Sequence, residues 1–220
     1  MKEMKKKYFH RKFCILLIAV LSSPVTYAQE NGNTNLSLNY GYYNFFKSTW
    51  IQKYMVNTIS GVPSIGIDIP ISETFSINSK AIYLYHKSDA ISEVYSDMGT
   101  LIKRYSGTTK VTEILLLPKV QMIMYRRDTF TFAVNLGPML GYIDENFEYS
   151  SYIYGSGHNF NFGIVGIAGG LTICNRLKES PFSILLSIDS QYASRGIKGD
   201  NSLLREYGGY LLSFGIGLDL

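Results

Sequence analysis

Most of the chain alternates between apolar and polar residues with a period of two, the pattern of β-strands whose two faces differ. The stretch "SIGIDIP" at 64–70 sets three isoleucines on one face against Ser, Gly and Asp on the other. After residue 28, no run of 18 apolar residues occurs and no segment sustains a helical repeat. The chain is therefore predicted to be all-β. The eight predicted strands cover roughly 35–46, 60–70, 74–86, 110–125, 129–142, 159–173, 182–193 and 207–220.

The connections between these segments alternate between short and long. The short links "ISE", "RRD" and "CNRLKESP" follow the second, fourth and sixth segments. Longer links, including 23 residues from Lys87 to Thr109, follow the others. Antiparallel strands in sequence order place all long loops at one end and all short turns at the other. We therefore expect an up-and-down arrangement with four long loops at one end. The third and sixth segments are ambiguous in register, which a β-bulge would explain.

The apolar face of these strands has two possible surroundings. In a soluble barrel or sandwich it points inward, whereas in a transmembrane barrel it faces lipid. The polar positions are rich in Gly, Ser, Ala and Asn, which suit a narrow interior, and most charges lie in the connections. This pattern favours an eight-stranded antiparallel up-and-down transmembrane β-barrel, with a soluble periplasmic ligand-binding barrel as the alternative. Tyrosines near the predicted strand ends are typical of interfacial girdles: Tyr40, Tyr42, Tyr83, Tyr85, Tyr125, Tyr142, Tyr192, Tyr207 and Tyr210.

The final segment, "YLLSFGIGLDL", shows the alternation most clearly. We expect Leu212, Phe214, Ile216 and Leu218 to face lipid, with the small residues between them facing the lumen. In lipid every backbone N–H and C=O must be paired, and a closed sheet has no edge. The first and last segments are therefore expected to pair, with the chain ending at the periplasmic rim.

The first 28 residues resemble a secretory signal peptide. A basic leader, "MKEMKKKYFHRK", precedes the nine-residue apolar core "FCILLIAVL", and a small residue, Ala28, ends the segment. Nine residues are too few for a spanning helix, which needs about 20. Cleavage after Ala28 would leave a domain over 29–220. It would remove six of the 21 basic residues and one of the 17 acidic ones, so the formal charge changes from +4 to −1. The basic character therefore gives no reason to expect nucleic-acid binding.

Cysteine and histidine are scarce in the predicted mature chain. Cys14 lies in the signal peptide, so Cys174 is single and no internal disulfide is expected. Two mature histidines and one cysteine do not form a structural zinc site. No cofactor or metal is expected.

The sequence resembles the porin-like outer-membrane β-barrel proteins of Bacteroidota, the PorT-like group. The resemblance covers essentially the whole mature chain. It is carried by the signal peptide and by "GVPSIGIDIPI", "ILLLPKV", "FAVNLGPMLGYI", "FNFGIVGIAGGLTI" and "SFGIGLDL". It implies a location in the outer membrane of a Gram-negative bacterium. It also implies contact with outer-membrane lipid and lipopolysaccharide, and insertion by the barrel-assembly machinery.

An eight-stranded barrel has an interior just wide enough to be filled by its own side chains, so no large open pore is expected. Five charged residues have inward parity, and charges in such an interior need partners. We expect a polar network in the lumen, with a narrow ion path as the alternative. The five residues are Asp68, Lys80, Glu113, Lys119 and Asp189.

"HKSDAISE" holds the one enzymatic pattern of the chain. His86 and Ser88 resemble the His-x-Ser of the outer-membrane lipid A deacylases, and Glu93 is a candidate to orient the imidazole. That motif continues with Asn, whereas this chain has Asp89, and parity turns His86 inward. We therefore expect a non-enzymatic barrel, with a lipid A deacylase-like hydrolase as the alternative.

The long connections hold most of the remaining aromatic and charged residues. Because binding residues concentrate on loops held by rigid scaffolds, an extracellular or envelope ligand is expected there. The loop candidates are Trp50, Tyr54, Tyr95, Arg104, Tyr105, Tyr149, Tyr152, Tyr154, Arg195 and Lys198.

Overall fold

The computed structural model describes residues 33–46, 59–95, 98–149, 158–197 and 200–220. Side chains are described within these ranges except at 90–95, 101–106, 147–149, 158–160, 195–197 and 200–205. The expected signal peptide lies outside the described residues. Within these ranges, no helix is long and apolar enough to cross a membrane.

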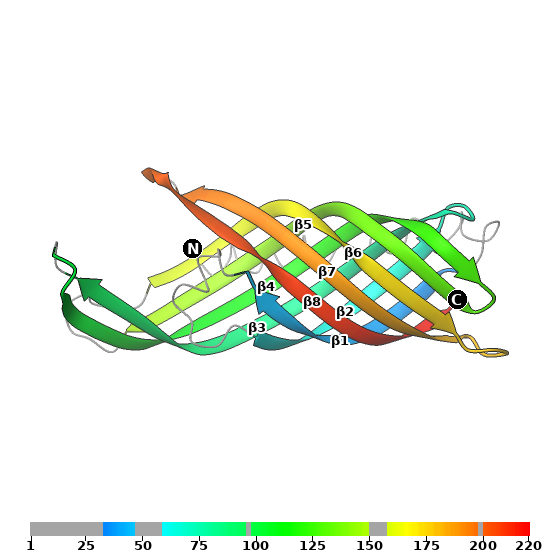
Figure 1. The fold of residues 1–220 in the computed structure, drawn as a ribbon, viewed down its shortest axis with the longest axis horizontal. Coiled ribbons are helices and arrows are strands. Elements are labelled where there is room, and N and C mark those ends of the chain that lie inside the picture. The colour runs from blue at the N-terminus through cyan, green and yellow to red at the C-terminus, as the bar shows by residue number, and fades with distance from the viewer. Residues whose placement is uncertain (1–32, 47–58, 96–97, 150–157, 198–199) are drawn as a thin grey trace, which may run out of the picture.

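Eight antiparallel strands form a closed barrel in which each strand pairs with the next and β8 pairs with β1 (Figure 1). The predicted fold class is confirmed. The strands are β1 (Asn35–Phe45), β2 (Ile59–Pro70), β3 (Phe75–Tyr95), β4 (Leu101–Arg127), β5 (Phe130–Tyr149), β6 (His158–Arg176), β7 (Phe182–Ile197) and β8 (Asp200–Asp219).

Closure of the barrel depends on the shortest strand. All 11 residues of β1 are paired with β8, from Asn35 opposite Asp219 to Phe45 opposite Gly209. On its other side β1 pairs with β2 over almost the same length. The two ends of the described chain thus form one continuous ladder, which leaves no sheet edge at the seam.

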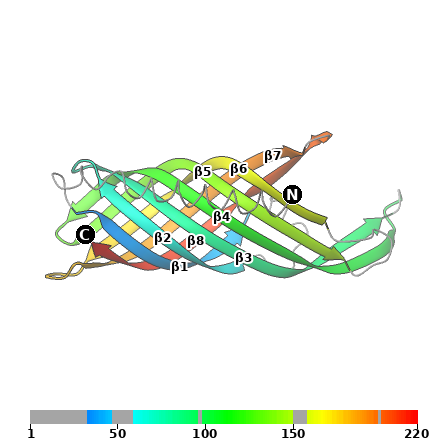
Figure 2. The same ribbon diagram turned by 180° about the vertical axis from the view of Figure 1, so that it is seen from behind.

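The expectation of four long loops is wrong for two connections and overestimates a third. Lys87 to Thr109 is mostly a hairpin, because β3 continues to Tyr95 and β4 begins at Leu101. β7 and β8 continue in the same way to residues 197 and 200, and β5 and β6 leave only 150–157 between them. Figures 1 and 2 show the β3–β4 and β7–β8 hairpins projecting beyond the rest of the wall. The sequence pattern missed these extensions because the period-two alternation is interrupted in them, as in "KSDAIS" at 87–92.

The strand register is continuous where the sequence was ambiguous. β3 pairs with β4 without a shift from Phe75 to Val94, and β5 pairs with β6 without a shift from Phe130 to Phe147. A bulge in the predicted third or sixth segment is therefore wrong. A shift does occur in β4, between Ile123 and Tyr125 on the side facing β5. Before this bulge the odd-numbered residues of β4 face inward, whereas after it the even-numbered residue Arg126 does.

The outer wall is apolar around its middle. Leu38, Leu136, Val165 and Ile216 each expose more than half of their surface, although they lie in the centre of paired strands. On β3 the outward residue Tyr85 is followed by Lys87 and Asp89, which are charged and exposed. The wall has the polarity of a barrel whose surroundings are apolar.

The interior is divided into two layers. On the side of the long hairpins, large apolar and aromatic side chains fill the lumen, among them Tyr43, Leu84, Leu117 and Tyr207. On the side of the short turns, most inward residues are polar or charged, with a few apolar ones such as Ala133 and Leu185. The apolar layer closes the barrel and the polar layer lies beneath it.

Candidate functional site

Three charged side chains meet at the centre of the polar layer. The carboxylate of Asp189 on β7 forms ion pairs with two lysines, one at each oxygen. Oδ2 lies 2.7 Å from Lys80 Nζ on β3, and Oδ1 lies 2.5 Å from Lys119 Nζ on β4. Asp189 is fully buried and neither lysine exposes more than 5% of its surface. This charge triad crosses the lumen and joins β7 to β3 and β4, neither of which is next to β7 in the sheet.

Two serines complete the coordination of Lys80. Its Nζ donates to Ser187 Oγ at 2.7 Å and lies 3.4 Å from Ser213 Oγ. The two hydroxyls are themselves 2.7 Å apart, which ties β7 to β8 inside the barrel. Lys80 therefore has three oxygen acceptors, which is the full donor capacity of an ammonium group.

The other two residues expected in the lumen lie apart from the triad. Glu113 is 3% exposed and lies among the apolar residues of the interior. On β4 it is two residues before Leu115, on the same face of the strand. Asp68 lies nearer the short turns, where it accepts Gln121 Nε2 at 3.1 Å. The five residues thus occupy three different levels of the interior.

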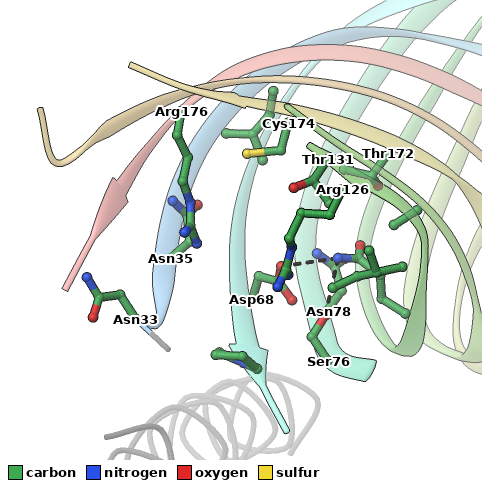
Figure 3. Close-up of a pocket in the computed structure, with 15 residues that line it drawn as sticks. Asn33, Asn35, Asp68, Ser76, Asn78, Arg126, Thr131, Thr172, Cys174 and Arg176 are labelled. Carbon is green, nitrogen blue, oxygen red and sulfur yellow. Dashed lines mark hydrogen bonds between the residues drawn. The ribbon is translucent and has the colours of Figure 1, made fainter. Parts of the chain in front are cut away.

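A pocket opens at the short-turn end of the barrel, below the charge triad (Figure 3). We call it the basal pocket. Measured to the surrounding atoms, and including the part open to solvent, its volume is about 620 Å³. Arg126 from β4 and Arg176 from β6 extend into it from separate strands. Arg176 Nε lies 3.4 Å from Asp219 Oδ2, whereas no ion pair of Arg126 occurs among the described residues.

The wall of the basal pocket holds buried acceptor oxygens. Gln121 Nε2 donates to Asp68 Oδ2 at 3.1 Å and to Ser76 Oγ at 3.2 Å, which fixes the amide. In the described part of the chain, Gln121 Oε1 and Asp68 Oδ1 are buried and accept no hydrogen bond. Gln121 is 4% exposed. A buried acceptor without a donor is costly, so this wall suits a ligand that donates hydrogen bonds.

His86 contacts a serine other than the one expected. Its Nδ1 is hydrogen-bonded to Ser60 Oγ on β2, and its ring packs edge-on against Phe45 at 5.7 Å between centroids. Both His86 and Ser88 are buried and face the interior, and Ser88 Oγ donates to the backbone oxygen of Asp89 at 3.1 Å. The side chain of Glu93 lies outside the described part of the structure. The two side chains therefore do not form a His–Ser pair that faces the lipid.

The loop candidates divide into two groups. Tyr95, Arg104, Tyr105, Tyr149 and Arg195 lie on strands rather than in loops. The other candidates, Trp50, Tyr54, Tyr152, Tyr154 and Lys198, lie outside the described residues. Among the residues described, no group of three His, Cys, Asp or Glu side chains is arranged to hold a metal ion.

The arginines of the basal pocket were missed from the sequence. Inward residues of β4 have odd numbers up to Gln121, but the bulge at Ile123/Tyr125 turns Arg126 inward instead. On β6 the ambiguous register hid the inward parity of Cys174 and Arg176. For Arg126, the signal that was available is the pair of arginines in the link "RRD".

Comparisons with known proteins support the fold. No protein-family model matches the chain, and no curated protein is detectably similar in sequence. Among solved structures, the outer membrane protein OprG from Pseudomonas aeruginosa is similar, with a TM-score of 0.51 and 9% identity over 86% of this chain and 97% of that one. Neisserial surface protein A has a TM-score of 0.47 and 8% identity over 85% of this chain and 97% of that one. The structural neighbours are small outer-membrane β-barrels, and the likeness to OprG shows that this chain has the same type of fold.

Proposed function

We propose that the protein is an outer-membrane β-barrel of a Gram-negative bacterium with a structural or surface-binding role, and that it belongs to the PorT-like, porin-like group of Bacteroidota. The observation that carries the proposal is the inverted polarity of the barrel. Leu212, Phe214 and Ile216 of β8 expose about half of their surface, while Ser213 between them is buried. Outward apolar residues on a closed sheet match a lipid surrounding, and the backbone pairing needed in lipid is complete around the seam.

The interior supports a closed barrel rather than an open pore. The charge triad spans the polar layer, and side chains such as Tyr43, Leu117 and Tyr207 fill the layer above it. An eight-stranded barrel of this kind leaves no water-filled channel. We therefore propose that solutes do not diffuse through it.

The projecting hairpins are the proposed surface for an extracellular or envelope partner. The backbones of the β3–β4 and β7–β8 hairpins project beyond the rest of the wall (Figure 1). A segment held in paired strands loses less conformational entropy on binding than a flexible loop does. The wall would meet outer-membrane lipid and lipopolysaccharide, and the barrel-assembly machinery would act on β8.

Two alternatives are disfavoured by specific observations. A soluble periplasmic barrel would expose Leu38, Leu136 and Val165 to water, each at 60% or more. A lipid A deacylase needs its His and Ser at the lipid face, but His86 and Ser88 point into the barrel. We therefore propose no enzymatic activity.

The test of the proposal is membrane fractionation combined with a heat-modifiability gel. We expect the protein in the outer-membrane fraction, migrating as a compact species that shifts on boiling. A folded protein that stays soluble without detergent contradicts the proposal. Liposome-swelling assays with small sugars are expected to show no uptake above empty vesicles.

A further inference from the structure

We propose that the basal pocket binds a small zwitterion of the α-amino-acid class, with the ligand ammonium group against Asp68 and Gln121 and its carboxylate between Arg126 and Arg176. This inference goes beyond a structural or surface-binding role. The exposure of the pocket to the periplasm rests on the proposed orientation in the outer membrane, but binding itself does not.

The acceptor side of the pocket is preorganised. Gln121 Nε2 is held by Asp68 and Ser76, so the amide cannot rotate without losing two hydrogen bonds. Its Oε1 and the neighbouring Asp68 Oδ1 are left without donors in the described part of the chain. An ammonium group carries three donors and a positive charge, so its donor capacity is sufficient for both oxygens.

The donor side of the pocket is formed by the two arginines. A guanidinium group has five N–H donors, and the contact of Arg176 with Asp219 involves Nε at 3.4 Å. Arg126 has no ion pair among the described residues, and Figure 3 shows it extending over Asp68 within the pocket. Arginine binds carboxylates in a two-pronged geometry, so this side suits a carboxylate.

Charge balance selects a zwitterion over a simple ion. The pocket lining carries two arginines and one carboxylate, Asp68, and Asp219, which lies outside the lining, pairs with Arg176, so the four charged residues together have a formal charge of zero. A lone anion would meet the carboxylates, and a lone cation would meet the guanidinium groups. The ammonium group of a zwitterion pairs with the acceptor side and its carboxylate with the arginine side. Such a ligand is electrostatically complementary to the pocket and brings no net charge into the barrel.

The position of the pocket makes it a binding site rather than a passage. It is open at the short-turn end, and the charge triad lies above it, since Lys119 is two residues before Gln121 on the same face of β4. A ligand that enters would have to leave by the same opening. We therefore expect reversible binding from one side of the membrane.

The test uses the mature chain folded in detergent micelles, with L-alanine as the probe. Saturation-transfer NMR on the alanine methyl protons measures binding. Cys174 lines the pocket and is the single cysteine of the predicted mature chain, so its rate of labelling by a small methanethiosulfonate locates the ligand. Acetate and methylammonium, each carrying one half of the probe, are tested alongside. Cys174→Ser confirms that labelling reports this thiol.

Variants separate the two sides of the site. Arg126→Gln and Gln121→Leu are each expected to weaken alanine binding roughly tenfold or more, because each removes a hydrogen bond to a charged group. Arg127→Gln is the matched control, since Arg127 is the next residue on β4 and does not line the pocket. Compact migration on an unboiled gel shows that each variant is folded.

The expected result is saturable alanine binding that slows labelling of Cys174, is lost in the two pocket variants and is kept in Arg127→Gln. Acetate and methylammonium are each expected to bind at least about tenfold more weakly. Absence of alanine binding overturns the inference, as does binding that all three variants share. Acetate or methylammonium binding equal to that of alanine also overturns it, in favour of an anion or a cation site. Failure of the fractionation test leaves this result unaffected, because the micelle assay does not depend on location.

Discussion

Lys119 extends from β4 across the barrel interior to Asp189 on β7, where its Nζ lies 2.5 Å from Oδ1 of the carboxylate. β4 and β7 are separated by two strands in the sheet, so this contact joins opposite parts of the wall. Lys80 completes the triad at 2.7 Å from the other oxygen. One carboxylate is therefore the ion-pair partner of two buried lysines, and its removal leaves both without that partner.

Asp189→Asn is expected to destabilise the folded barrel by about 3–5 kcal/mol, because it leaves buried lysines uncompensated. Urea unfolding in lipid vesicles, followed by tryptophan fluorescence or gel shift, measures the change. The control is Asp89→Asn, an exposed position on β3, which should change the unfolding free energy by less than about 0.5 kcal/mol. Equal effects of the two changes would contradict a structural role of the triad.

A charged residue on the outer face of β8 is expected to destabilise the folded barrel. Ile216→Arg should lower the unfolding free energy by about 2–4 kcal/mol, since Ile216 is 58% exposed in the apolar band and arginine there would meet hydrocarbon. Ser194→Arg, outward on β7 beyond Tyr192, should cost at most about 1 kcal/mol near the interface. Unfolding titrations of both variants in vesicles provide the comparison. A tolerated Ile216→Arg would contradict the proposed lipid contact.

Close packing between β6 and β7 depends on a glycine. A Cβ at Gly170 would lie 2.9 Å from Asp189 Cα and would contact the backbone oxygen of Ile188. Gly170→Ala is therefore expected to cost about 1–3 kcal/mol and to reduce the yield of compact barrel. Gly163→Ala, on the same strand, has its nearest neighbour at 3.7 Å and serves as the control. Similar yields for both variants on unboiled gels would exclude this packing constraint.

Ser88→Ala is expected to leave the lipid A of producing cells unchanged. Ser88 is buried, and its hydroxyl donates to the backbone oxygen of Asp89. Mass spectrometry of lipid A from cells with the wild-type protein, with the variant and without either is the measurement. Loss of an acyl chain from lipid A that depends on Ser88 would support the lipid A deacylase-like alternative.

How much of the fold could be predicted differs between the wall and the hairpins. The period-two alternation was sufficient for the eight strands and their antiparallel order, because each strand has one apolar and one polar face. It was insufficient for residues 87–95 of β3 and 101–109 of β4, where apolar and polar residues do not alternate regularly. Those residues pair through the backbone, and backbone pairing does not by itself require an alternating side-chain pattern.

The sites depended more strongly on tertiary structure. Parity alone assigned Asp189 to the inward face of its strand, but only closure of the barrel brings Lys80 and Lys119 to the same carboxylate. The basal pocket was not predictable, because a bulge in β4 reverses the parity that would have placed Arg126 outside.

The sequence by itself determined the strand-forming segments, the polarity of the wall and the small residues needed inside a narrow barrel. These properties follow from interactions between neighbours in the chain and from the solvent on each face. The tertiary structure decided which charges meet, how far the hairpins project and where the pocket opens. Those outcomes depend on the register around a closed sheet, where a shift of one residue turns every following side chain to the other face.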